Sequence, residues 1–149
     1  MQQKIKLRNK YLKLRKKNYR QIDKTFFSPL LKLIKFRLKK KFIRIAIYYP
    51  SNFELDVLKL LEFKSILAQD ILLPAIDKKN LMNFFSWKKN EVLFINKFGI
   101  LEPIKTEIKI PDLILVPMLA FDKNKYRLGY GKGFYDRYLN KYLKKFKSI

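Results

Sequence analysis

Three of the chain's four glycines alternate within one short stretch, as Gly129, Gly131 and Gly133. A sequence so poor in glycine is expected to keep it for positions at positive φ or for close approach of the backbone to a ligand. Arg127 and Lys132 add two cations to the same stretch. Backbone N–H groups, cations and the start of a helix together form an anion site. We therefore predict a phosphate-binding loop; a tight turn between a strand and a helix is the simpler alternative.

The segments on either side of this loop predict its place in the fold. Residues 112–117 form an apolar run flanked by prolines, which predicts a buried strand. After the loop, apolar and aromatic residues recur with helical spacing: Tyr135, Tyr138, Leu139, Tyr142 and Phe146. Open α/β sheets bind ligands in loops that follow the carboxyl ends of their strands. The loop is therefore expected at the binding edge of such a sheet.

The rest of the chain alternates between helical and strand patterns. Helices are predicted over residues 3–18, 28–38 and 51–67, and strands over residues 42–49, 70–74, 81–87 and 91–95. Residues 98–103 are expected to form a loop, and residues 91–95 are expected to pair with a neighbouring strand. This alternation predicts a single three-layer α/β/α domain over residues 1–149, with a mostly parallel, mixed sheet and the N-terminal helices packed on it.

Several polar residues of the helices have both a structural and a functional interpretation. Ser28 and Pro29 match the N-cap and the first residue of the second helix, with an earlier start of the helix as the alternative. Ser51 and Glu54 match a capping box, which by itself accounts for the glutamate. In the first helix Leu7, Tyr11 and Leu14 form an apolar stripe, and Lys4, Arg8 and Arg15 cluster on the adjoining face. The cluster is either a solvated basic face or presents a pair of cations, Lys4 and Arg8 one turn apart, to a polyphosphate.

Composition limits the chemistry that is open to the chain. It has no cysteine and no histidine, which excludes disulfides, thiol nucleophiles, histidine bases and Cys/His zinc sites. The 48% of hydrophobic residues can form a real core. No apolar run is long enough for a membrane span, and no secretory signal follows the basic N-terminus. We expect a cytoplasmic protein without a membrane partner, whose chemistry depends on lysine, arginine, tyrosine, carboxylates and bound metal or cofactor.

The formal net charge of +23 has two explanations. A strong basic excess is typical of proteins that bind nucleic acid. However, lysine outnumbers arginine by 28 to 7, and isoleucine, phenylalanine, asparagine and tyrosine are also abundant. All of these have AT-rich codons, so compositional drift of a genome explains the charge without a polyanionic partner. We expect no specific binding of nucleic acid, and keep a basic nucleic-acid-binding protein as the alternative function.

One block of the sequence resembles the signature of the 5-formyltetrahydrofolate cyclo-ligase family. The block consists of residues 112–122 and residues 127–136, and it is specific. Weaker matches follow in the family's order over essentially the whole chain: residues 4–8, Tyr49 with Glu54, residues 73–74, residues 98–100 and residues 102–103. The loop is neither a Walker A motif nor a complete Gly-x-Gly-x-x-Gly fingerprint.

The resemblance implies a fold, a reaction and its co-substrates. The family uses ATP and Mg²⁺ to close 5-formyltetrahydrofolate into 5,10-methenyltetrahydrofolate, with release of ADP and phosphate. The formyl oxygen attacks the γ-phosphate, and the folate N10 then attacks the activated carbon. No covalent enzyme nucleophile is needed, because positioning and charge neutralisation do most of the work in phosphoryl transfer. We expect small-molecule partners only and a monomer, although an exposed sheet edge favours self-association.

The resemblance also implies roles for individual residues. Lys132 and Arg127 match the catalytic cations of the loop, Asp136 matches a magnesium ligand, and Tyr49 and Glu54 match substrate-binding positions. The matches to the ATP site are Lys4, Arg8, Arg127, Leu128, Gly129, Tyr130, Gly131, Lys132, Gly133, Phe134 and Tyr135. Met82 and Trp87 are either walls of a pterin pocket or ordinary core residues.

Two departures from the family pattern leave a further alternative open. The family usually has glycine at the position of Met118. Family members also continue beyond the position of Ile149, with a further strand and a loop that carries an acidic metal ligand. An inactive, truncated remnant of a cyclo-ligase is therefore the second alternative function.

Overall fold

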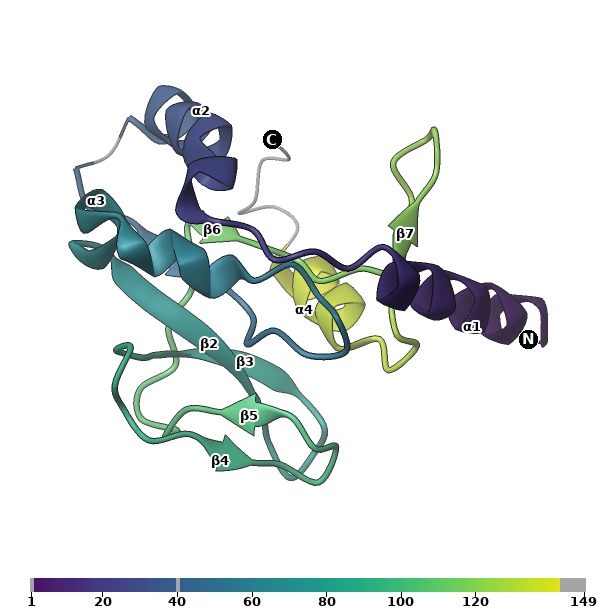
Figure 1. Ribbon diagram of the computed structural model, residues 1–149. Coiled ribbons are helices and arrows are strands. Elements are labelled where there is room, and N and C mark those ends of the chain that lie inside the picture. Colours follow the sequence, from purple (N-terminus) through teal and green to yellow (C-terminus); the bar gives the residue numbers. More distant parts are fainter. Residues whose placement is uncertain (1, 40, 143–149) are drawn as a thin grey trace.

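The computed structural model describes residues 2–39 and 41–142 and is built around a mixed four-stranded sheet (Figure 1). Its strands are β1 (Arg44–Ala46), β2 (Asp70–Ile76), β3 (Met82–Ser86) and β6 (Leu113–Ile114). They lie in the order β3-β2-β1-β6. Strand β1 runs parallel to β2 and to β6, whereas β3 runs antiparallel to β2. The prediction of a mostly parallel, mixed sheet is confirmed.

Alternate residues of the central strands enter two separate cores. In β1, Ile45 pairs with Ile71 and Ala46 pairs with Leu72 across the parallel ladder. Ile45 and Ile71 belong to one buried cluster, and Ala46 and Leu72 belong to another. Successive side chains of a strand point to opposite faces of its sheet, so the two clusters lie on opposite faces. Both faces of the sheet are therefore covered.

Each face has its own helices. The first cluster includes buried side chains of α2 (Ser28–Leu38) and of η2 (Val57–Glu62), and α3 (Lys64–Leu67) follows η2 directly. The second cluster contains Tyr138 of α4 (Phe134–Tyr142), which packs against the buried Phe84 at a ring distance of 4.8 Å. Helices on both faces of the sheet make three layers, as predicted. The expected continuation of the last helical stripe to Phe146 lies outside the described residues.

The first helix, α1 (Gln2–Lys17), stands apart from these layers. None of its residues is buried, and Figure 1 shows it extending away from the sheet beside β7. Of the two N-terminal helices, α2 therefore packs on the sheet, and α1 is attached elsewhere. Its expected stripe of Leu7, Tyr11 and Leu14 does not enter either core, since Leu7 and Leu14 are exposed.

One predicted helix start is wrong, and for a second helix the alternative of an earlier start is the one observed. The expected helix from Ser51 to Leu67 does not begin at Ser51, because Asn52 and Phe53 adopt positive φ angles of 47° and 61°. A 3-10 helix, η2, begins instead at Val57, where Asp56 caps the N–H of Leu58. Helix α2 begins with Ser28 inside it and Phe27 at the cap, because the 3-10 helix η1 (Lys24–Phe27) precedes it directly.

Strands β1, β3 and β6 are shorter than predicted, β2 extends two residues further, and two small hairpins are added. Ladder hydrogen bonds continue beyond the ends of β1 and β6. The N–H of Leu115 donates to the carbonyl of Ala46 at 2.8 Å, and the N–H of Ile47 donates to the carbonyl of Leu72 at 3.0 Å. One hairpin joins β4 (Phe94–Ile95) to β5 (Leu101–Glu102), so the predicted loop at 98–103 contains a strand. The other joins β7 (Ala120–Phe121) to β8 (Arg127–Leu128). In the part of the chain that the structure describes, no helix has the length and apolar character of a membrane span.

Candidate active site

The glycine loop, residues 129–133, connects β8 to α4. Gly131 and Gly133 adopt positive φ angles of 99° and 68°. At Gly131 a Cβ atom would lie 2.9 Å from Cζ of Arg8, and at Gly133 it would lie 3.0 Å from Nη1 of Arg137. The positive φ angle favours glycine at both positions, whereas the arginine ends are flexible and could shift away from an added Cβ. Gly129 has open space around it and is not constrained in this way.

Two arginines of α1 reach this loop. Arg8 donates from Nε to the carbonyl of Gly129 at 2.9 Å. Arg15 donates from Nη1 to the hydroxyl of Tyr130 at 2.6 Å and from Nη2 to the carbonyl of Met118. The two arginines are two helical turns apart and share a face of α1. Lys4 was expected to contact ATP together with Arg8, and its side chain is exposed.

Arg15 is the functional residue that sequence reasoning missed. It was noted as part of the basic cluster of α1 but was not assigned to the site. The available signal was its spacing from Arg8, since residues seven apart in a helix lie on one face. That spacing does not say which face of a helix meets the rest of the protein. Only the packing of α1 against the loop does so.

Glu54 is a buried carboxylate that faces the glycine loop. Glu54 is only 7% exposed to solvent. Oε2 accepts hydrogen bonds from Ser51, from the backbone N–H at 2.9 Å and from Oγ at 3.3 Å. Oε1 accepts the hydroxyl of Tyr130 at 2.7 Å. The hydrogen bond expected between Ser51 and Glu54 is thus present although no helix begins at Ser51. The other carboxylate oxygen of Glu54 binds Tyr130 of the glycine loop.

Two tyrosine hydroxyls lie close to this carboxylate. Burial raises the pKa of Tyr130, and the hydrogen bond and negative charge of Glu54 raise it further. Burial also raises the pKa of Tyr135, with smaller contributions from Glu54 and Tyr48. The hydroxyl of Tyr135 is buried and has no hydrogen-bond partner among the described residues. Since buried polar groups are nearly always paired, a water molecule or a ligand atom would complete this hydroxyl's hydrogen bonding.

The remaining charged residues of the loop lie near the start of α4. Arg127 forms an ion pair with Asp136, in which the Asp136 side chain is 73% exposed and the Arg127 side chain 20% exposed. Asp136 belongs to the first turn of α4, where the helix dipole favours a negative charge. Lys132 places Nζ 5.2 Å from the ring centroid of Phe98. Arg127 thus lies in β8 before the glycine loop and contacts the first turn of α4, and Lys132 lies within the loop.

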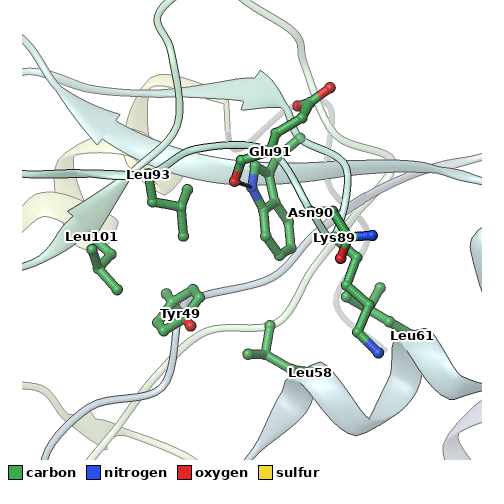
Figure 2. Close-up of a pocket in the computed structure, with 9 residues that line it drawn as sticks. Tyr49, Leu58, Leu61, Lys89, Asn90, Glu91, Leu93 and Leu101 are labelled. Carbon is green, nitrogen blue, oxygen red and sulfur yellow. Dashed lines mark hydrogen bonds between the residues drawn. The ribbon is translucent and has the colours of Figure 1, made fainter.

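A pocket of about 370 Å³ lies on the opposite side of the sheet from α4 (Figure 2). Tyr49, Leu58, Leu93 and Leu101 point into it in Figure 2, and Lys89, Asn90 and Glu91 form its rim. Its wall also includes Trp87, whose ring meets that of Tyr49 edge to face at 6.4 Å. Trp87 is at once a core residue and a wall of this pocket.

The pocket and the glycine loop are joined by one segment of the chain. Tyr49 and Glu54 both follow β1, and they face different sites: Tyr49 lines the pocket, and Glu54 binds Tyr130 of the loop. Met82, the other expected wall residue, packs in the second core with Phe84 and Tyr138 instead. The structure therefore brings Glu54 to the glycine loop and Tyr49 to the apolar pocket.

Comparison with known families and proteins gives one consistent result. The family model for the 5-formyltetrahydrofolate cyclo-ligase family matches residues 1–148. A probable 5-formyltetrahydrofolate cyclo-ligase of Schizosaccharomyces pombe is 41% identical over 82 residues, which are 50% of this chain and 40% of that protein. The 5-formyltetrahydrofolate cyclo-ligase of Haemophilus influenzae is 30% identical over 132 residues, which are 84% of this chain and 69% of that protein. The chain thus matches from two fifths to about two thirds of the length of these relatives.

Solved structures agree with the sequence relatives. The NMR structure of the Aquifex aeolicus 5,10-methenyltetrahydrofolate synthetase superimposes with a TM-score of 0.70 at 31% identity, over 98% of this chain and 74% of that one. The Mycoplasma pneumoniae 5,10-methenyltetrahydrofolate synthetase gives a TM-score of 0.62 at 28% identity, over 92% of this chain and 77% of that one. Both similarities extend over nearly the whole of this chain.

Proposed function

This chain belongs to the 5-formyltetrahydrofolate cyclo-ligase family, and we propose that it closes 5-formyltetrahydrofolate to 5,10-methenyltetrahydrofolate with ATP and Mg²⁺. ADP and phosphate are the other products. The observation that carries the proposal is the hydrogen bond between Tyr130 and Glu54. It joins a loop built for phosphate to a buried carboxylate on the segment that also supplies Tyr49 to the pocket. A reaction between a nucleotide and a second substrate requires two such adjacent sites.

The glycine loop would hold the phosphates of ATP. Positive φ angles at Gly131 and Gly133 keep side chains out of the loop, so its backbone can approach a phosphate closely. Arg8 already contacts the loop, and Lys132 within the loop and Arg127 of β8 supply positive charge. The other loop residues expected at the nucleotide surround these: Leu128, Gly129, Tyr130, Phe134 and Tyr135. Lys4, one turn before Arg8, would join the site by contacting the nucleotide directly.

The folate would lie on the other side of Glu54. A pterin ring is flat and carries several N–H donors, which a buried carboxylate is suited to accept. Tyr49 and Trp87 supply an aromatic wall of the pocket, and Tyr49 lies on the same chain segment as Glu54. Such a pocket, mostly apolar with a few polar groups, is the usual form of a small-molecule site. We assign substrate binding to Glu54 and Tyr49, with Trp87 as a wall.

Asp136 fits a magnesium ion that arrives with the nucleotide. Among the described residues no cluster of three or more acidic, histidine or cysteine side chains is arranged to hold a metal by itself. Nucleotide-bound Mg²⁺ takes most of its ligands from phosphate and water and needs only one or two carboxylates. An exposed carboxylate next to the phosphate loop meets that need. When bound, Mg²⁺ would supply charge neutralisation for the phosphates.

The proposed chemistry needs positioning more than acid or base groups. The formyl oxygen forms a bond to the γ-phosphorus while the bond from that phosphorus to ADP breaks. N10 of the folate then adds to the formyl carbon, loses its proton to solvent, and the carbon–oxygen bond breaks with release of phosphate. Lys132 and Arg127 stabilise the negative charge on the transferring group, as cations do in phosphoryl transfer generally. Glu54 keeps the folate oriented toward that group.

In the described part of the chain, no observation favours the nucleic-acid alternative in particular. Arg8 and Arg15 of the basic helix donate hydrogen bonds to the glycine loop, and Arg15 also donates to the carbonyl of Met118. Absence of specific nucleic-acid binding stays a prediction, as does the distinction between an active enzyme and an inactive remnant.

The direct test uses the purified chain with 5-formyltetrahydrofolate and MgATP and no other enzyme. We expect the absorbance of methenyltetrahydrofolate to appear together with ADP, and to depend on both ATP and Mg²⁺. A Glu54→Gln variant should lose most of this signal, because a neutral amide binds pterin N–H donors less strongly. Glu107→Gln is the matched control, since Glu107 is an exposed glutamate paired with Lys109 away from the loop. Absence of product together with undetectable ATP binding would contradict the proposal.

A further inference from the structure

The hydroxyl of Tyr130 is held between two charged side chains. It accepts a hydrogen bond from Nη1 of Arg15 at 2.6 Å and donates one to Oε1 of Glu54 at 2.7 Å. A guanidinium can only donate, and a tyrosine hydroxyl has a single proton. That proton is therefore directed to Glu54, and the positive charge of Arg15 polarises the hydroxyl toward it. The three side chains form one directed chain of hydrogen bonds.

Arg15 is itself fixed relative to the sheet. Its second nitrogen, Nη2, donates to the carbonyl of Met118, a residue between the end of β6 and the start of β7. Because a guanidinium is planar and rigid, binding Met118 with one nitrogen determines where the other can hold Tyr130. The position of the loop tyrosine is thus set from the segment that connects β6 to β7.

The attachment of α1 depends strongly on these polar contacts. None of the residues of Gln2–Lys17 is buried, so apolar packing contributes little to its position. Arg8 binds the backbone of the loop at Gly129, and Arg15 binds a side chain of the loop at Tyr130. Loss of Arg15 would therefore leave the loop backbone attached while Tyr130 lost its orientation toward Glu54.

We infer that Arg15 is a positioning residue that couples the glycine loop to Glu54 through the hydroxyl of Tyr130. The inference rests on the proposed function, in which the loop binds ATP and Glu54 binds the folate. A nucleotide that orders the loop also orders Tyr130, and Tyr130 then holds Glu54 in the orientation that the folate requires. Binding of either substrate thereby strengthens binding of the other by the same factor, as thermodynamic linkage demands.

The test measures the dissociation constant of 5-formyltetrahydrofolate with and without a non-hydrolysable ATP analogue and Mg²⁺. In the unmodified chain we expect the analogue to tighten folate binding by about fivefold or more. Arg15→Gln and Tyr130→Phe should each reduce this ratio to about one, since each breaks the same chain of hydrogen bonds. The double variant should be no different from either single one. Arg15→Lys should keep only part of the tightening of folate binding by the ATP analogue, because an ammonium lacks the planar, rigid arrangement of donors of a guanidinium.

Lys13→Gln is the matched control, because Lys13 is an exposed cation of the same helix. It should keep the full ratio. Denaturant unfolding of each variant separates a loss of coupling from a loss of folding; Arg15 and Tyr130 are partly exposed, so all variants are expected to fold. If folate binds but the ratio is about one in the unmodified chain, or is retained in Arg15→Gln, the coupling is refuted and the proposed function stands. If the unmodified chain binds no folate at all, both are refuted.

Discussion

The centre of the sheet and the glycine loop are held in place by different interactions. In the sheet, Leu72, Leu73 and Phe84 are 0% exposed, and the regular ladder of β2 and β3 places Leu72 and Phe84 in one core and Leu73 in the other. At the loop, α1 has no buried residue, and its arginines bind residues 121 and 115 positions away in the chain. Apolar burial thus determines the layers, and a few charge-assisted hydrogen bonds determine the site.

This difference has an energetic consequence. Burying a large apolar side chain contributes about 1.5–3 kcal/mol, and removing one from a core costs more because a cavity remains. A hydrogen bond to a charged group contributes about 1.5–3 kcal/mol when both partners are well placed. The loop has few of these and little burial. Changes there are therefore expected to affect ligand binding and turnover far more than folding.

The sharpest test of this separation is the loss of a loop charge. Lys132→Ala and Asp136→Ala should each lower turnover by about a thousandfold, the order lost when one transition-state charge is removed. The free energy of unfolding should change by less than about 1 kcal/mol, because both side chains are on the surface. Steady-state kinetics and urea titration measure the two effects separately.

Lys97→Ala is the control for Lys132→Ala. Lys97 places its Nζ 5.3 Å from the same ring of Phe98 that Lys132 approaches at 5.2 Å, and it lies outside the loop. It removes an equivalent cation–ring contact and should leave turnover unchanged. Equal losses in the two lysine variants, or full activity in Asp136→Ala, would show that the loop charges have been assigned wrongly.

The second test removes a large buried side chain from the core between the sheet and α4. Phe84→Ala should lower the free energy of unfolding by about 3–5 kcal/mol, because it leaves a cavity between β3 and α4. Phe94→Ala is the comparison, since Phe94 is an exposed phenylalanine of β4, and it should cost less than about 0.5 kcal/mol. Denaturant unfolding monitored by circular dichroism compares them. Similar losses in both variants would contradict the assignment of the second core.

The smallest expected effect lies where the two regions meet. Tyr135 packs its ring against Phe84 of the core at 6.4 Å, while its buried hydroxyl has no partner among the described residues. Tyr135→Phe should therefore keep the stability or raise it by about 1 kcal/mol, because an unpaired buried hydroxyl is costly. The same change should weaken substrate binding by about tenfold if that hydroxyl binds a ligand.

Tyr126→Phe is the matched control for this pair of measurements. Tyr126 is an exposed tyrosine of the β7–β8 connection, so both stability and substrate affinity should be unchanged. A clear loss of stability in Tyr135→Phe would mean that its hydroxyl is already paired in the folded protein. Unchanged substrate affinity would remove Tyr135 from the site.

The layers could be predicted because their signals are local. Apolar runs such as residues 42–49 and 70–74 indicate buried strands, and their cores formed as expected. The failures also have local causes that hydrophobic spacing does not report. Asn52 and Phe53 have positive φ angles, so no helix begins at Ser51 although the capping-box pattern of Ser51 and Glu54 favoured one. The hairpin of β7 and β8 was missed because each strand has only two residues.

The site was predicted in part, through its glycines and through family resemblance. Gly131 and Gly133 have the positive φ angles that their scarcity suggested. Glu54 lies beside the loop, and Tyr49 lines a pocket with Trp87. Arg15 was not predicted, and the structure brings Arg8 rather than Lys4 to the loop. The catalytic, nucleotide and metal roles of the loop residues stay predictions.

By itself, the sequence determined which residues need burial and which positions need glycine, because both follow from the chemistry of single side chains and their neighbours along the chain. It also excluded histidine and cysteine chemistry. Only the tertiary structure decided that a helix near the N-terminus, a carboxylate near the middle and a loop near the C-terminus meet at Tyr130. Polar contacts between such distant residues have no periodicity, and folding of the apolar layers brings the partners together.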